Sequence, residues 1–207
     1  MNKIEIFIAR LLSIVFHPLL MPTIAVGVLF GLGTHISFAL SQQAQLLIIL
    51  IVLVNTAVAP VLVILFFKKV GYVENLYLNE RSDRIYPTAI TIFLYLFTWY
   101  LFRQANLPEI LSFFVTGSIL LTVVALAVTF YWKISIHMLS MGGFTGFLIC
   151  LAMLLEQDIV LLILVSIIIA GLLGTARIKL NAHTPSQVYA GYTVGVLTML
   201  IMYWIHY

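Results

Sequence analysis

Four side chains that can bind or transform an anion lie within eleven residues near the end of the chain. They are Arg177, Lys179, His183 and Gln187, and long apolar runs flank them on both sides. Charged and ionisable side chains are expensive to place beside hydrocarbon, so in such surroundings they usually mark a functional site. A guanidinium group binds phosphate oxygens in a fixed fork, and an imidazole reacts near neutral pH. We therefore expect Arg177 to hold an anion and His183 to do chemistry on it.

Two further polar patches lie at the ends of apolar runs. Arg81 and Arg84 stand one helical turn apart and suit a phosphate, although a solvated loop with internal ion pairs explains them equally well. Ser135 and His137 form the second patch. A single histidine at a membrane boundary is often satisfied by water or backbone, but the neighbouring serine and Lys133 favour a site.

The residues that follow His183 predict the start of a helix. Thr184 is expected as the N-cap, Pro185 as the first helical residue, and Gln187 as the residue that closes a capping box. His183 then lies just before the positive end of a helix dipole, which favours an anion and helps to keep the imidazole neutral. Capping alone would also account for Gln187, so this residue has two readings.

In chain order, these patches resemble the signature of the type-2 phosphatidic acid phosphatase (PAP2) superfamily of membrane lipid phosphatases. That signature reads K-x6-R-P, then P-S-G-H, then S-R-x5-H-x3-D. Arg177, His183 and Gln187 match the third block at the family's spacing, with Gln187 where the family has Asp.

The sequence matches the other two blocks more loosely. Ser135 and His137 keep the second block, with isoleucine in place of its proline and glycine. Arg84 lies three residues before Pro87 and stands for the first block. The resemblance covers residues 79–195, which is more than half of the chain.

The resemblance implies metal-independent hydrolysis of a lipid phosphate or pyrophosphate through a phosphohistidine. His183 would be the nucleophile, and His137 would be the general acid and then the base that activates water. Gln187 would accept a hydrogen bond from the nucleophilic ring. The phosphate-binding residues would be Arg177, Arg84, Arg81 and Ser135.

Gln187 departs from the family at a position that bears on catalysis. The family's Asp accepts a hydrogen bond from the nucleophilic imidazole and stabilises its positive charge, whereas glutamine supplies the bond alone. In the serine-protease triad, the analogous Asp→Asn change lowers kcat by about 10⁴. The sequence therefore carries a second function class, a non-catalytic or hydrolysis-impaired binder or transporter of anionic lipids.

Composition indicates an integral membrane protein. Hydrophobic residues make up 63% of the chain, charged residues 8%, and the mean hydropathy is +1.17, which excludes a soluble core. We predict an all-α, polytopic transmembrane helical bundle in a single membrane domain, with two spans in residues 1–67 and a PAP2-like core in residues 68–207. About seven spans are expected, over residues 10–33, 45–67, 88–105, 109–131, 136–155, 159–175 and 186–205.

Several features of these spans predict how they are built. Glycines at near-helical-turn spacing in the last three spans predict that these helices pack closely. These glycines are Gly142, Gly143, Gly146, Gly171, Gly174, Gly191 and Gly195. In the first span, His17-Pro18 predicts a helix kink and no site. The N-terminal residues show no small-residue cleavage pattern and predict a retained helix.

The spans also predict which face carries the site. Nine of the ten Lys and Arg residues fall on the face of the three patches, and Arg103 falls on the other, so the positive-inside rule makes the site cytoplasmic. The resemblance favours the periplasmic face of a bacterial inner membrane, which stays open as the alternative. We expect no cofactor, no metal and no nucleic acid, and a lipid phosphate and membrane lipids as partners. The oligomeric state is left open.

Overall fold

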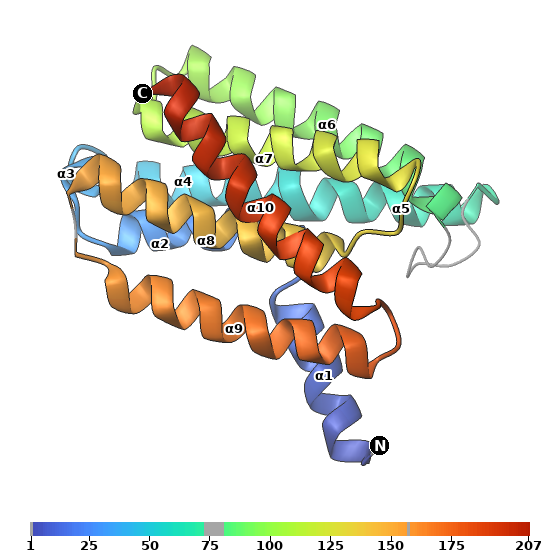
Figure 1. Ribbon diagram of the computed structural model, residues 1–207. Coiled ribbons are helices and arrows are strands. Elements are labelled where there is room, and N and C mark those ends of the chain that lie inside the picture. The colour runs from blue at the N-terminus through green and yellow to red at the C-terminus, as the bar shows by residue number, and fades with distance from the viewer. Residues whose placement is uncertain (1, 73–80, 157) are drawn as a thin grey trace. The chain divides into compact units, whose positions relative to one another are not determined.

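The protein is built of helices joined by short connections (Figure 1). The computed structural model describes residues 2–72, 81–156 and 158–207, and of residues 81–84 it describes the backbone only. These residues contain no β-strand. The helical elements are α1 (Lys3–Val15), α2 (Met21–Gly31), α3 (His35–Phe38), α4 (Gln42–Leu53), the π-helical turn η1 (Val54–Val58), α5 (Ala59–Lys69), α6 (Arg81–Gln104), α7 (Glu109–Thr129), α8 (Ile136–Leu155), α9 (Val160–Lys179) and α10 (Pro185–His206).

Six segments among the described residues are long and apolar enough to cross a membrane. They are Gln42–Lys69, Ile85–Gln104, Glu109–Thr129, Ile136–Leu155, Val160–Lys179 and Pro185–His206. Each has at least the 17 or so residues that a ~30 Å hydrocarbon layer requires. The predicted all-α polytopic bundle is therefore confirmed, and these six segments correspond to the last six predicted spans.

The first predicted span does not form one helix. α1 ends at Val15 and α2 begins at Met21, so the expectation of a single kinked helix around His17 was wrong. Pro18 supplies the physical reason. Proline has no N–H to donate, and it disfavours helical backbone in the residue before it, so the helix stops instead of bending.

The chain forms two compact units. The terminal unit consists of residues 1–21 and 133–207 and so contains α1, α8, α9 and α10, whereas the central unit consists of residues 22–132. In the central unit, α4, η1 and α5 run on as one rod. The π-helical turn ends two residues before Pro60, whose missing N–H would break a regular helical ladder. The prediction that the chain is a single membrane domain stays a prediction.

In the terminal unit, α8 and α10 cross at very short range (Figure 1). A Cβ atom placed on Gly142 would collide with the backbone oxygen of Tyr192, and one placed on Gly195 would collide with that of Leu139. Without side chains, these glycines let the two backbones touch. The close packing expected from the glycine spacing is confirmed for this pair of helices.

The glycines of α9 differ from each other. A Cβ atom on Gly174 would lie 2.9 Å from Cγ1 of Val188, so α9 also approaches α10 closely at this point. Gly171, one turn earlier, has no neighbouring atom within 4 Å of such a Cβ. The expectation of close packing was therefore right at Gly174 and wrong at Gly171.

Candidate functional site

The C-terminal end of α9 sets the spacing between Arg177 and His183. Asn181 has a φ of +52°, the left-handed conformation that ends many helices. The N–H of Asn181 donates to the carbonyl of Ile178 at 2.9 Å, and the N–H of Ala182 donates to that of Arg177 at 3.1 Å. This pair of bonds is a Schellman motif, which reverses the chain. The five residues between Arg177 and His183 are thus the end of one helix and the turn before the next.

α10 begins as the sequence predicts. The hydroxyl of Thr184 accepts from the N–H of Gln187 at 3.5 Å, and Oε1 of Gln187 accepts from the N–H of Thr184 at 3.2 Å, which completes the capping box. The same Oε1 lies 3.0 Å from Nδ1 of His183. An amide oxygen only accepts, so Nδ1 of His183 carries the proton and the lone pair of the neutral ring lies on Nε2. Gln187 therefore caps the helix and orients His183 at once.

The start of α8 lies against the first turns of α10. The N–H of Ser135 donates to the carbonyl of Gln187 at 3.4 Å. A Cβ atom on Gly191 would lie 2.8 Å from the carbonyl oxygen of Ser135, so only glycine allows this approach. The structure thereby brings the second and third sequence patches together. Ser135 is fully buried, and its hydroxyl makes no hydrogen bond within the described residues.

His137 is oriented by the N-terminal helix. Its Nε2 lies 3.1 Å from the backbone carbonyl oxygen of Ser13, near the end of α1. A carbonyl oxygen only accepts, so Nε2 donates, and the lone pair of the neutral ring lies on Nδ1. Arg177, His17 and His183 all lie close enough to His137 to act on it electrostatically. Both predicted histidines and the predicted arginine therefore belong to one cluster.

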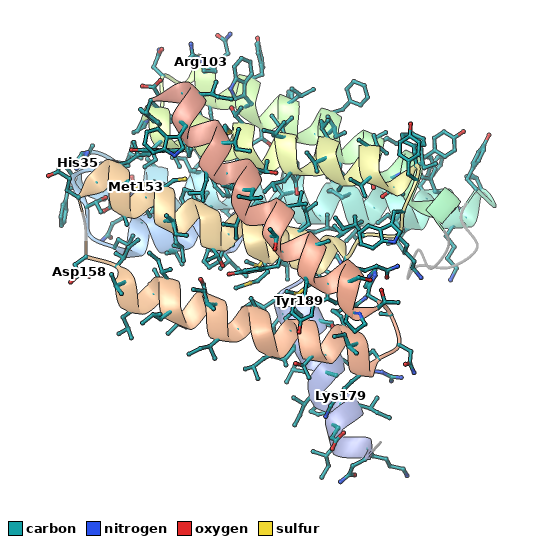
Figure 2. All side chains as sticks on the ribbon, viewed as in Figure 1. His35, Arg103, Met153, Asp158, Lys179 and Tyr189 are labelled. Atoms are coloured by element: carbon teal, nitrogen blue, oxygen red, sulfur yellow. The ribbon has the colours of Figure 1, made fainter. Side chains whose placement is uncertain are left out.

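Arg177 contacts the same residue of α1. Its Nη1 donates to the hydroxyl of Ser13 at 3.2 Å, and that hydroxyl donates to the carbonyl of Ala9 at 2.9 Å. Two residues further on lies Lys179, at the end of α9 (Figure 2), and it pairs with Glu5 of α1 at 3.1 Å. Both side chains of this ion pair are about half exposed, so it contributes little to stability. Lys179 thus lies at the surface and outside the cluster.

Sequence reasoning missed Ser13 and His17. The ring centroids of His17 and His137 lie 5.2 Å apart, with the ring planes at 83°. The N–H of Leu19 donates to Nδ1 of His17 at 3.3 Å. Burial and, to a smaller extent, the charge of Arg177 together lower the pKa of His17 to about 4. The available signal was an ionisable residue beside a proline inside an apolar run, which was interpreted as a kink alone.

The first sequence patch belongs to the other unit. The backbone of Arg81 and Arg84 forms the first turn of α6 in the central unit. Their side chains lie outside the described residues. The phosphate-binding role expected of these two arginines stays a prediction.

No protein-family model, curated protein or solved structure matches this chain. The resemblance to the PAP2 superfamily therefore rests on the residue pattern itself. The described part of the terminal unit supplies an arginine and two imidazoles in defined orientations, and the backbone of the buried Ser135 contacts Gln187 beside them. These groups are suited to binding a tetrahedral anion and transferring a proton beside it.

Proposed function

We propose that this protein is an integral membrane phosphatase of the PAP2 type, which hydrolyses a lipid phosphate or pyrophosphate through a phosphohistidine. The observation that best supports this function is the pair of opposite tautomers. His183 presents Nε2 as its basic nitrogen, whereas His137 presents Nδ1. One ring is thus prepared to attack phosphorus and the other to exchange protons, as the two steps of such a reaction require.

In the first step, Nε2 of His183 attacks phosphorus and the bond from phosphorus to the lipid oxygen breaks. Protonated His137 gives the proton on Nδ1 to the departing oxygen, so the lipid leaves as an alcohol or as a shorter phosphate. The hydrogen bond from Nδ1 of His183 to Gln187 keeps its ring in place as the ring becomes positively charged. The product is a phosphoramidate on His183, with His137 now neutral.

In the second step, Nδ1 of neutral His137 takes a proton from water, and the oxygen of that water attacks phosphorus. The bond from phosphorus to Nε2 of His183 breaks, which releases inorganic phosphate and restores both rings. Arg177 stays charged throughout and stabilises the charge on the non-bridging oxygens. The buried hydroxyl of Ser135 is a further donor for those oxygens, and the positive end of the α10 dipole favours their negative charge.

The substrate would meet the site at the membrane boundary. Lys179 and Glu5 form a half-exposed ion pair at the end of the apolar helix α9, and the cost of placing charges in hydrocarbon favours a position at the membrane boundary for this end of the terminal unit. The predicted topology places nine of the ten cationic residues on the face with the three patches, and a basic rim attracts anionic head groups. We assign this face to the cytoplasm on the charge count, with the periplasm as the alternative.

Gln187 favours one other function. A neutral amide supplies no counter-charge to a phosphorylated imidazole. A site that only binds an anion needs no such counter-charge. The same arginine and histidines would then hold an anionic lipid without a covalent step. This second candidate is a binder or transporter of anionic lipids.

The deciding experiment measures phosphate release by the purified protein in detergent with EDTA present. The substrates are phosphatidate and a polyprenyl pyrophosphate, and a third, p-nitrophenyl phosphate, has a leaving group that needs no proton. The phosphatase predicts release by the wild type and none by His183→Gln. His137→Gln should lose activity on the lipid substrates. It should still accumulate an acid-labile phosphoenzyme when it is given a ³²P-labelled activated ester. No release above the His183→Gln background, together with retained lipid binding, would establish the binder instead.

A further inference from the structure

Ser13 contacts two members of the cluster with two different groups. Its carbonyl oxygen lies 3.1 Å from Nε2 of His137, and its hydroxyl lies 3.2 Å from Nη1 of Arg177. Ser13 is buried, at 7% exposure, although α1 exposes most of its other large side chains. α1 therefore rests on the rest of the terminal unit through the strip that contains Ser13.

The carbonyl of Ser13 is available because α1 stops before Pro18. In a continuing helix, this carbonyl would accept the N–H of His17, but that N–H donates instead to the carbonyl of Ile14 at 3.2 Å. The last carbonyls of a helix need partners from elsewhere, and they form the negative end of its dipole. The donors that meet this end are His137 and Arg177, which fits the sign of the dipole.

We propose that Ser13 is a positioning residue of the site. Its carbonyl keeps the proton of neutral His137 on Nε2, so that Nδ1 is the nitrogen that exchanges protons with the substrate and with water. Its hydroxyl sets the direction of the Arg177 guanidinium group, which is to hold the phosphate. The purpose of this positioning rests on the proposed function. The tautomer of His137 and the placement of Arg177 can be measured without turnover of a substrate.

The first test reads the tautomer of His137 in the full-length wild type. The protein is labelled with ¹⁵N-histidine, and long-range ¹H–¹⁵N correlation spectra are recorded in detergent near pH 8. The signals of His137 are assigned by their loss in His137→Gln. We expect Nε2 protonated and Nδ1 bare in His137, and the opposite tautomer in His183. A His137 ring with its proton on Nδ1, or one that exchanges between both tautomers, would overturn the proposal whether or not the protein hydrolyses phosphate.

The second test isolates the hydroxyl with two variants of the same shape. Ser13→Thr keeps the hydroxyl and Ser13→Val replaces it by a methyl group, so both add the same bulk to the helix contact. Binding of inorganic phosphate is followed through the signals of His183. A hydrogen bond to a charged group is lost only in Ser13→Val, so that variant should bind phosphate about 10-fold more weakly than Ser13→Thr.

Equal binding of phosphate by the two variants would contradict the role of the hydroxyl. If neither variant folds, the wild-type tautomer still decides the role of the carbonyl. If the tautomers are as expected but no lipid phosphate is hydrolysed, the positioning role stands and the proposed phosphatase function fails. The two proposals are thereby distinguished.

Discussion

Nδ1 of His183 lies 3.0 Å from Oε1 of Gln187, the same oxygen that accepts the N–H of Thr184 and caps α10. A glutamine can hold the tautomer of the ring in this way, but it cannot stabilise a positive charge on it. The chemistry open to the site therefore depends on the charge at position 187, and this charge can be changed without disturbing the helix.

We predict that Gln187→Glu raises the rate of phosphate release. Glutamate also closes a capping box, so α10 should start as before, and the carboxylate adds a counter-charge for the phosphorylated ring. The corresponding charge in a serine-protease triad contributes about 10⁴ in kcat, so an increase of about 10-fold or more is expected here. The measurement is kcat on the best lipid substrate. Gln187→Met, which removes both the acceptor and the cap, is the matched control and should lose activity.

Helix packing in the terminal unit should depend on specific glycines. Gly142→Ala or Gly195→Ala forces a methyl group into the backbone of the facing helix, which should lower the free energy of unfolding by about 1–3 kcal/mol or more. Gly171→Ala meets open space and should be neutral or stabilising by up to about 1 kcal/mol. Thermal unfolding in detergent checks all three. A loss of stability at Gly171 equal to that at Gly142 would contradict the helix arrangement.

The turn after α9 should tolerate glycine but not alanine. Asn181 has a φ of +52°, which glycine adopts without strain and alanine adopts at a penalty of about 1–2 kcal/mol. Asn181→Gly should therefore unfold at the wild-type temperature, whereas Asn181→Ala should unfold earlier. If the turn also sets the distance between Arg177 and His183, phosphate release by Asn181→Ala should fall more than its stability does.

The pH dependence of stability should contain a contribution from His17. Burial, and then the charge of Arg177, lower the pKa of His17 to about 4 from its ordinary 6.5. The unfolded chain thus binds a proton between pH 6.5 and 4 that the folded chain does not bind. The free energy of unfolding should therefore fall as the pH drops through this range, by roughly 3 kcal/mol in total, and change little on this account above pH 6.5.

The measurement is the unfolding temperature as a function of pH. His17→Phe keeps the ring and removes the proton site, so it should flatten the slope between pH 6.5 and 4. Arg177→Gln should move the titration of His17 upward, because it removes the neighbouring positive charge. A His17 signal that titrates near 6.5 in the wild type would show that the ring is not held as described.

The sequence predicted those features that depend on near neighbours. The capping box of Thr184 and Gln187 follows from residues three positions apart, and the helices follow from apolar runs of sufficient length. The contact of α8 with α10 followed from glycine spacing, because small residues have few other reasons to recur at this period in lipid-facing helices. Interactions between residues that are close in sequence leave local patterns, so these features could be predicted from the sequence.

The contribution of α1 could not be predicted in the same way. Ser13 and His137 are 124 positions apart, and a serine in an apolar helix has many possible partners. The group that orients His137 is a backbone carbonyl. Every residue has this group, so no residue type in the sequence points to it. Pro18 was recognised as a disturbance of the helix, but its consequence, a carbonyl released for a distant imidazole, required the tertiary structure.

The hydrogen bond between Arg177 and Ser13 joins residues 164 positions apart, and this separation has a consequence for biosynthesis. Helix α1 is synthesised before α8 and α9, the helices that carry its partners His137 and Arg177. A nascent chain that stops before Arg177 therefore lacks this hydrogen bond, so the contacts of Ser13 form only after α9 has been made. Under the proposed function, a chain truncated before Arg177 in α9 has neither Arg177 nor His183 and should release no phosphate.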